Sequence, residues 1–139
     1  MADLTVTHRF EAPAEQVFDA WLNPAIARRF LLTAPGGEVV RCEIDARVGG
    51  RFTIVDRRDD PGDIEHVGEY LEIDRPRRLV FTFAVPQFDP TVTRVTVEIA
   101  PDGPGCILTL THDDVPAEWV EQDREGWTMI LASLARELD

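Results

Sequence analysis

The segment THDDVPAEW at residues 111–119 places His112 beside two carboxylates, Asp113 and Asp114. A histidine next to an aspartate can serve as a general acid and base, or as part of a metal site. Acid-base chemistry also requires a partner within hydrogen-bond reach of a bound substrate. The segment therefore raises a catalytic or metal-binding hypothesis that depends on what the rest of the chain supplies.

The other polar residues offer few partners for such a site. The three histidines fall in three different predicted strands, and their spacing is not that of a metal motif such as HExxH. The acids that follow Asp114 lie where negative charge stabilises the start of a helix, and they lack the EF-hand spacing. We expect no metal and no cofactor, and Tyr70 with His112 as the best-placed pair if the protein is an enzyme.

Composition excludes several functional classes. The formal net charge is −12, which repels nucleic acid and anionic membranes at long range, so no nucleic-acid partner is expected. All the basic residues are arginines, and the absence of lysine excludes Schiff-base chemistry. Cys42 and Cys106 are far apart without a CxxC motif, which favours reduced thiols packed in the core.

Nothing in the sequence resembles a membrane or targeting segment. No apolar run approaches the ~20 residues that cross a bilayer, and the N-terminus lacks a basic start followed by a hydrophobic block. We therefore expect a cytoplasmic protein without membrane insertion. Its 139 residues suit one domain, residues 1–139.

The first third of the chain predicts a strand followed by two short helices. LTVTHRF at residues 4–10 alternates apolar and polar side chains, as in a half-buried strand. APAEQVFDAWL then has apolar residues at helical spacing, with Pro13 suited to the first turn. NPAIARRF begins with an Asn23 cap and a proline, which predicts a second helix.

Residues 38–113 predict a meander of antiparallel strands. Short apolar runs are separated by turns rich in Gly, Pro and Asp, at intervals of about a dozen residues. The last run is expected to end at His112, with Asp113 and Asp114 in a solvent-facing turn. Pro116 and the acids then mark the start of the final helix.

The C-terminal segment predicts a long amphipathic helix. Trp127, Ile130, Leu131, Leu134 and Leu138 recur at helical spacing, so this stripe must be buried against one face of the sheet. One stripe does not fill a curved sheet, which favours a cavity beneath the helix. Gly126 is costly inside a helix, so either the helix approaches the sheet there or space is kept for a ligand.

Alternation along the strands places aromatic and polar side chains on the face toward this helix. Such an apolar lining with a few polar tips is typical of a small-ligand site. The expected lining comprises Trp21, Phe30, Phe52, His66, Tyr70, Phe81, Phe83, Val97, Leu110, His112, Trp127, Ile130 and Leu134. Plain core packing is the alternative for each of these residues, and a histidine satisfied by a backbone carbonyl is the alternative for His112.

Five stretches, in order, resemble the family of activator-of-heat-shock-protein-ATPase homologues, in the START-like or SRPBCC superfamily. They are FEAPAEQVFDAWLNP, DARVGGRF, GEYLEIDRPRRLVFTF, LTLTH with its following proline, and GW in the last helix. The resemblance implies an α+β helix-grip fold like that of the birch pollen allergen. In this fold a curved seven-stranded antiparallel sheet wraps around a C-terminal helix, with two short helices after the first strand.

The resemblance does not fix the function, because members of this superfamily bind lipids, hormones or polyketides and a minority are enzymes. We expect binding of a small hydrophobic molecule, with a cyclase- or hydrolase-type reaction in the same cavity as the alternative. Co-chaperone members carry a further domain ahead of this one. Here the first strand begins close to Met1, which counts against a chaperone partner. A homodimer through Trp119 or Val120 is a further possibility.

Overall fold

The computed structural model describes residues 2–32, 38–58 and 62–139. Its strands form one seven-stranded antiparallel sheet in the order β1-β7-β6-β5-β4-β3-β2. Three α-helices and one short 3-10 helix complete the described chain. The strands are β1 (Ala2–Phe10), β2 (Glu38–Ile44), β3 (Arg51–Arg57), β4 (Asp63–Asp74), β5 (Arg78–Val85), β6 (Asp89–Asp102) and β7 (Gly105–Val115). The helices are α1 (Ala14–Ala20), α2 (Pro24–Phe30), η1 (Ala117–Trp119) and α3 (Val120–Leu138).

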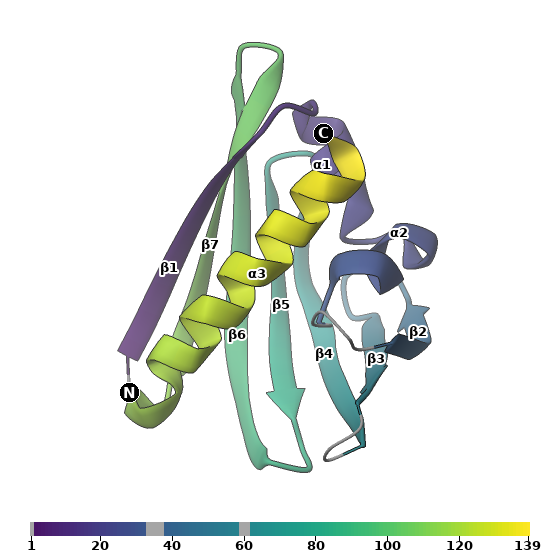
Figure 1. The fold of residues 1–139 in the computed structure, drawn as a ribbon, viewed down its shortest axis with the longest axis vertical. Coiled ribbons are helices and arrows are strands. Elements are labelled where there is room, and N and C mark those ends of the chain that lie inside the picture. Colours follow the sequence, from purple (N-terminus) through teal and green to yellow (C-terminus); the bar gives the residue numbers. More distant parts are fainter. Residues whose placement is uncertain (1, 33–37, 59–61) are drawn as a thin grey trace.

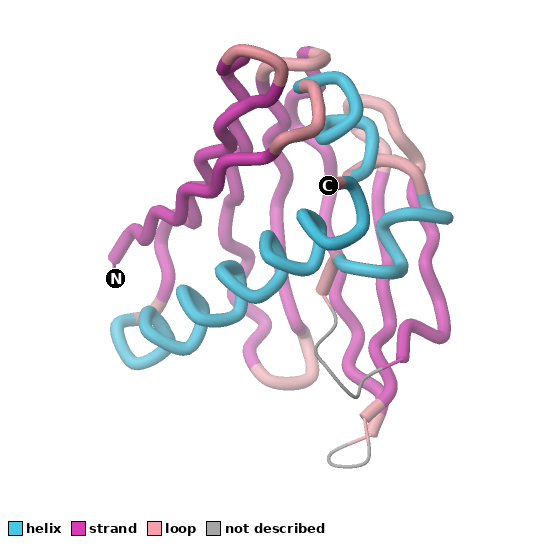
Figure 2. The backbone as a smooth tube through the Cα atoms, turned by 45° about the horizontal axis from the view of Figure 1, so that its top comes forward, coloured by secondary structure: helices cyan, strands magenta, loops and turns pink. Residues whose placement is uncertain are grey.

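The sheet curves around α3, which crosses its concave face diagonally (Figures 1 and 2). The helices α1 and α2 lie at the end of the sheet where α3 finishes, as Figure 1 shows. The predicted stripe of α3 faces inward, because Trp127, Ile130, Leu131 and Leu134 are all buried. These features confirm the predicted helix-grip fold.

Short-range signals position the two small helices as the sequence predicts. The side chain of Asn23 accepts a hydrogen bond from the Ala25 backbone N–H at 3.0 Å, and Pro24 occupies the first turn of α2. Pro13 stands one residue earlier than predicted, as the cap of α1. The carboxylate of Asp139 accepts hydrogen bonds from the backbone N–H groups of Glu11 and Ala12 at 3.2 Å, which ties the end of α3 to the start of α1.

The predicted end of the last strand is wrong. β7 continues past His112 to Val115, because Asp113 still pairs with Arg94 of β6 and Val115 still pairs with Ala2 of β1. The side chain of Arg94 also donates to the Asp113 carboxylate at 2.9 Å. Asp114 takes a positive φ of 61°, at the irregularity that lets the strand bend before α3.

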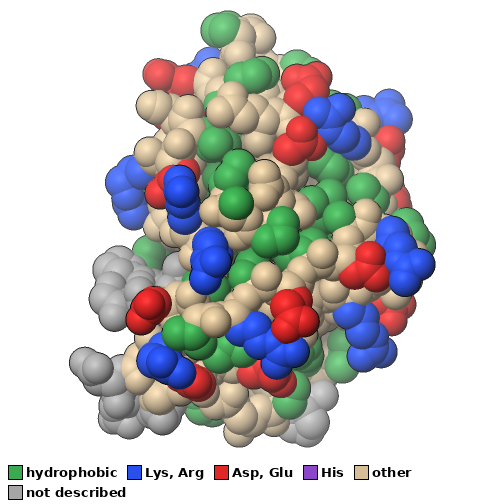
Figure 3. Space-filling model, turned by 90° about the vertical axis from the view of Figure 1, so that its right-hand side faces the viewer, with side chains coloured by type: hydrophobic (Ala, Val, Ile, Leu, Met, Phe, Trp, Pro, Cys, Tyr) green, Lys and Arg blue, Asp and Glu red, His purple; other side chains and the backbone are tan. Residues whose placement is uncertain are grey.

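The surface pairs arginines with acids. Arg75 contacts Asp19 at 2.7 Å, and Arg9 contacts Asp102 at 2.8 Å. In the face shown in Figure 3, basic and acidic side chains alternate around exposed hydrophobic ones. Positive charge on this face is therefore balanced locally.

No helix in the described ranges has the length and apolar character that a membrane span requires. Cys42 and Cys106 are free thiols, on β2 and β7.

Two glycines show how tightly the sheet and the helix constrain the interior. Gly68 lies opposite Phe52 in the β3–β4 pairing, and a Cβ at this position would stand 2.0 Å from the Thr82 carbonyl oxygen and 2.3 Å from the Phe52 ring. The absence of a side chain at Gly68 therefore lets Phe52 lie flat on the sheet. A Cβ on Gly126 would meet nothing within 4 Å. Of the two explanations offered for this glycine, a close approach of the helix to the sheet is therefore wrong.

These environments predict opposite effects for two matched substitutions. Gly68→Ala should lower the free energy of unfolding by about 3 kcal/mol or more, because the clash involves backbone as well as the aromatic ring. Gly126→Ala should raise the free energy of unfolding by about 1 kcal/mol, the helix-propensity difference. Urea unfolding followed by circular dichroism measures both. A destabilising Gly126→Ala would show that the position is not open.

Candidate functional site

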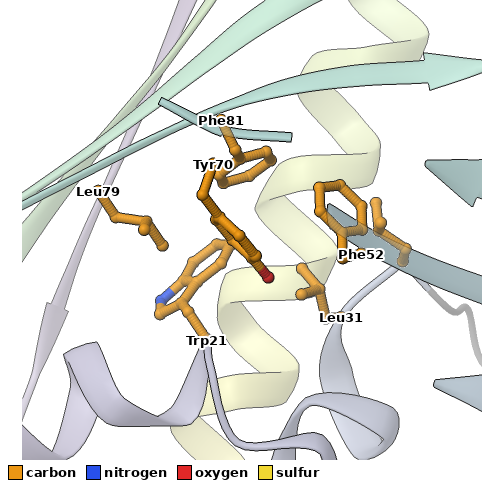
Figure 4. Close-up of a pocket in the computed structure, with 7 residues that line it drawn as sticks. Trp21, Leu31, Phe52, Tyr70, Leu79 and Phe81 are labelled. Carbon is orange, nitrogen blue, oxygen red and sulfur yellow. The ribbon is translucent and has the colours of Figure 1, made fainter. Parts of the chain in front are cut away.

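A small apolar pocket lies between the sheet and the helical end of the fold (Figure 4). The sheet supplies one wall, from β3, β4 and β5, and the α1–α2 segment with the two residues after it supplies the other. The lining residues are Trp21, Leu31, Leu32, Phe52, Tyr70, Leu79 and Phe81. The cavity volume is about 10 Å³, which is close to the space that one water molecule needs.

Aromatic contacts hold the sheet wall of this pocket together. Phe52 stands edge-on to Phe81 with ring centroids 5.5 Å apart, and Tyr70 lies 5.7 Å from Phe52. Trp21 closes the opposite side at 6.4 Å from Phe81. Rings in these arrangements stabilise one another beyond the area that they bury. The aromatic side chains of the pocket therefore hold one another in position.

The pocket surface is almost wholly apolar, but two of the lining residues carry a polar group. Burial raises the pKa of the Tyr70 phenol well above its ordinary value of 10.0, so its hydroxyl stays protonated and can donate or accept a hydrogen bond. Its oxygen points toward the space beside Leu31 in Figure 4. The second polar group is the indole N–H of Trp21, a residue that is 1% exposed. Within the described part of the chain, this N–H has no acceptor.

A second cluster surrounds His112, further along the concave face. The Trp127 indole N–H donates to His112 Nδ1 at 3.1 Å, so this nitrogen is unprotonated. His112 Nε2 then carries the proton and donates to Thr93 Oγ1 at 2.7 Å, and the Thr93 hydroxyl donates to the Phe83 carbonyl oxygen at 3.1 Å. Every donor in this chain has an acceptor, which defines a neutral histidine in one tautomer.

The environment keeps His112 neutral. Burial lowers its pKa from 6.5 to about 4, against a smaller opposing effect from the Asp113 carboxylate. Asp123 Oδ2 lies 3.8 Å from His112 Nδ1, and burial raises the pKa of Asp123. Because Nδ1 already accepts from Trp127, it offers Asp123 no proton. This close approach is therefore not an ion pair at neutral pH.

His66 lies in the same cluster as His112, because both rings contact Phe83. Its Nδ1 lies 3.2 Å from the Ile54 carbonyl oxygen, and burial lowers its pKa below 6.5. Phe83 separates the two buried histidines, with ring centroids 6.0 Å from His66 and 5.5 Å from His112. The histidines therefore pack on a common aromatic ring instead of facing a shared cavity.

This geometry does not support the predicted acid-base pair. Tyr70 lines the pocket, whereas His112 lies in the second cluster, is 2% exposed and uses both ring nitrogens in hydrogen bonds. The apparent triad of the THDDV segment also separates, because Asp113 binds Arg94 and the exposed Asp114 lies outside the interior. The described residues contain no group of three or more side chains arranged to hold a metal ion.

The predicted lining residues fall into three groups. Trp21, Phe52, Tyr70 and Phe81 line the pocket. His66, Phe83, His112 and Trp127 form the second cluster. Phe30, Val97, Leu110, Ile130 and Leu134 are buried in the core, where Phe30 packs edge-on against Trp21 at 5.5 Å.

Three lining residues were not predicted. Leu79 shares the strand alternation of Phe81 in RLVFTFAV, so a stricter use of that alternation would have found it. Leu31 and Leu32 follow a short helix, where no periodic pattern indicates which way a side chain points. Leu32 takes a positive φ of 57°, which is rare for a bulky residue and is invisible in the sequence.

Comparison with known proteins identifies the family. A family model described as "Activator of Hsp90 ATPase homolog 1-like protein" matches residues 11–139. The chain belongs to this family. The resemblance inferred from the sequence motifs is thereby confirmed. No functionally curated protein matches the chain in sequence.

Solved structures of related proteins share the fold over nearly the whole chain. Protein CV1439 from Chromobacterium violaceum is 24% identical with a TM-score of 0.87, and the match covers 99% of this chain and 98% of that one. The AHSA1-like protein from Aeromonas hydrophila is 24% identical with a TM-score of 0.83, covering 97% and 90%. CalU16 from Micromonospora echinospora is 22% identical with a TM-score of 0.74, covering 99% and 76%. At these identities the likeness shows the fold alone.

The neutral state of His112 predicts a pH-dependent stability. The unfolded chain takes up this proton near pH 6.5, whereas the folded protein does so only near pH 4. Between these values the unfolded state holds more protons. Lowering the pH through this window should therefore reduce the free energy of unfolding, by up to about 3 kcal/mol. Urea unfolding at several pH values measures this slope.

His112→Gln provides the matched variant, because an amide can accept from Trp127 and donate to Thr93 without titrating. The variant should lose most of the slope. The remaining slope should combine His66, whose lowered pKa acts in the same direction, with Asp123, whose raised pKa acts in the opposite direction. A His112→Gln protein that keeps the full slope would contradict the assignment of a neutral, buried His112.

Proposed function

We propose that the protein binds a small, largely apolar molecule in the pocket between the sheet and the α1–α2 segment. The observation that carries this proposal is the convergence of four aromatic and three leucine side chains from separate elements on one site, with a phenol hydroxyl among them. Apolar walls with a few placed polar groups are the usual composition of a small-molecule site. Family membership supports the fold of such a site but does not identify its ligand.

The cavity volume of about 10 Å³ means that entry of a ligand requires the walls to part. The two walls differ in what such a movement costs. Phe52, Tyr70 and Phe81 belong to strands whose backbones pair on both sides, so moving them breaks sheet hydrogen bonds. Leu31 and Leu32 lie outside helix and sheet, which makes this the wall that moves at lower cost.

The backbone conformation at Leu32 supports this division of the walls. A leucine at a φ of 57° is held in the left-handed region, which costs about 1–2 kcal/mol relative to its preferred conformations. Such strain persists where surrounding contacts impose it, and it is frequent at ligand-binding and switching segments. A movement of Leu32 away from the pocket that also returns its φ to negative values would release this strain and offset part of the cost of opening.

The free energy available to a ligand is sufficient for weak binding. Burying roughly 300 Å² of apolar ligand surface gives a gross gain of about 7 kcal/mol. This gain alone corresponds to a dissociation constant of about 10 μM, and the cost of immobilising the ligand and opening the wall weakens the affinity toward the millimolar range. A cyclase or hydrolase reaction has no comparable support, because His112 is already engaged by Trp127 and Thr93.

A pair of matched leucine substitutions tests the location of the site. Small aromatic compounds and short-chain lipids should raise the thermal unfolding temperature of the wild-type protein, and native mass spectrometry should detect the complexes. Leu79→Phe fills the pocket and should abolish this stabilisation. Leu108→Phe overpacks a fully buried strand position outside the pocket and should leave it intact.

The controls separate a wrong site from a wrong function. Both variants should lose about 1–3 kcal/mol of stability from overpacking, so each is compared with and without compound. Equal responses of the two variants to the compounds would place binding elsewhere in the molecule. A wild-type protein that responds to none of the compounds would contradict the proposed function.

A further inference from the structure

The Trp21 indole N–H is the one buried side-chain polar atom without a hydrogen-bond partner among the described residues. Trp21 is 1% exposed, so bulk solvent does not reach this donor. A buried donor without an acceptor costs about 1–3 kcal/mol. The corresponding group of Trp127, buried in the same interior, donates to His112 at 3.1 Å. The contrast marks Trp21 as an exception that has a specific cause.

The position of Trp21 connects this donor to the pocket. Trp21 is the residue that caps α1, and its ring forms part of the pocket lining. In Figure 4 the indole nitrogen lies on the ring edge nearer Leu79, on the side away from Phe52 and Leu31. Leu79 has no polar side-chain atom, so its side chain offers this nitrogen no acceptor.

The chemistry of the lining restricts what can satisfy the donor. An indole N–H only donates, so its partner must be an acceptor. None of the seven lining residues is charged, which makes the site unfavourable for an ammonium or a carboxylate that lacks a counter-ion. A neutral oxygen such as a carbonyl or an ether fits both conditions. The Tyr70 hydroxyl, on the Leu31 side of the pocket, can serve a second polar atom of the same molecule.

We propose that the ligand is an uncharged, mainly apolar molecule that carries a carbonyl or ether oxygen, and that this oxygen accepts a hydrogen bond from Trp21 Nε1. The inference rests on the proposed function and narrows its ligand class. It excludes pure hydrocarbons, amines and fatty-acid anions as preferred ligands. It also assigns Trp21 a recognition role that its burial in the core does not reveal.

Two probes of nearly equal shape test the oxygen preference. In α-methylstyrene a CH₂ group replaces the carbonyl oxygen of acetophenone. Their dissociation constants are measured by NMR titration for the wild type, for Trp21→Phe and for Trp127→Phe. The last variant is the control, because the Trp127 indole of the wild type already has a hydrogen-bond partner in His112. Trp21→Phe should lower the affinity ratio of ketone to alkene by roughly fivefold to tenfold. Trp127→Phe should leave that ratio unchanged.

A spectroscopic measurement on the wild type keeps the test independent of whether Trp21→Phe folds well. The chain has three tryptophans, so a ¹⁵N-labelled sample gives three indole N–H signals. Acetophenone should move the Trp21 indole signal downfield as a hydrogen bond forms. α-Methylstyrene, which has no acceptor, should not cause this downfield shift. A Trp21 signal that responds equally to both probes would overturn the inference.

The remaining outcomes distinguish this inference from the proposed function. If compounds bind in the Leu79-dependent manner described above but Trp21→Phe leaves the ketone-to-alkene ratio unchanged, the ligand-class inference fails and the pocket proposal stands. A strongly shielded Trp21 signal that neither probe moves would mean that the Phe30 ring satisfies the donor, and it would also overturn the inference. If neither probe nor any panel compound binds, both proposals fail.

Discussion

The structure depends on how one helix covers the concave face of a wide antiparallel sheet. The apolar stripe of α3 buries Trp127, Ile130, Leu131 and Leu134, but a single stripe covers only part of seven strands. The uncovered part lies toward β3, β4 and β5, where aromatic side chains and the α1–α2 segment fill the space. The pocket follows from this shortage of helical cover, whereas the His112 cluster lies against Trp127 of α3.

The two clusters solve the problem of burying polar groups differently. Around His112 every donor has an acceptor, so the cluster is closed and its histidine is held neutral. In the pocket the Trp21 N–H has no partner within the described chain. A satisfied network rigidifies an interior, whereas an orphaned donor lowers the free energy cost of admitting an acceptor. The closed cluster therefore needs no further hydrogen-bond partner, and the pocket is the site that we propose for the ligand.

Periodicity and turn chemistry made most of the fold predictable. Strand alternation placed Tyr70, Phe81 and His112 on the concave face, and the Asn23 cap located α2. The end of β7 was mispredicted because pairing with Arg94 and Ala2 on neighbouring strands extends it, and such pairing is a tertiary effect. The sequence also predicted that His112 and Tyr70 belong to one site, whereas the structure separates them. Strand alternation indicates which face of the sheet a side chain lies on, but not which side chains of other strands lie next to it.

Our proposal places the ligand in the Trp21 pocket instead of beneath Trp127. Intermolecular nuclear Overhauser effects from bound acetophenone to assigned side-chain protons measure this directly. A ligand in this pocket should contact the methyl groups of Leu31 and Leu79 and the ring of Phe81. Contacts to Phe83 and Trp127, with none to Leu31 or Leu79, would contradict it.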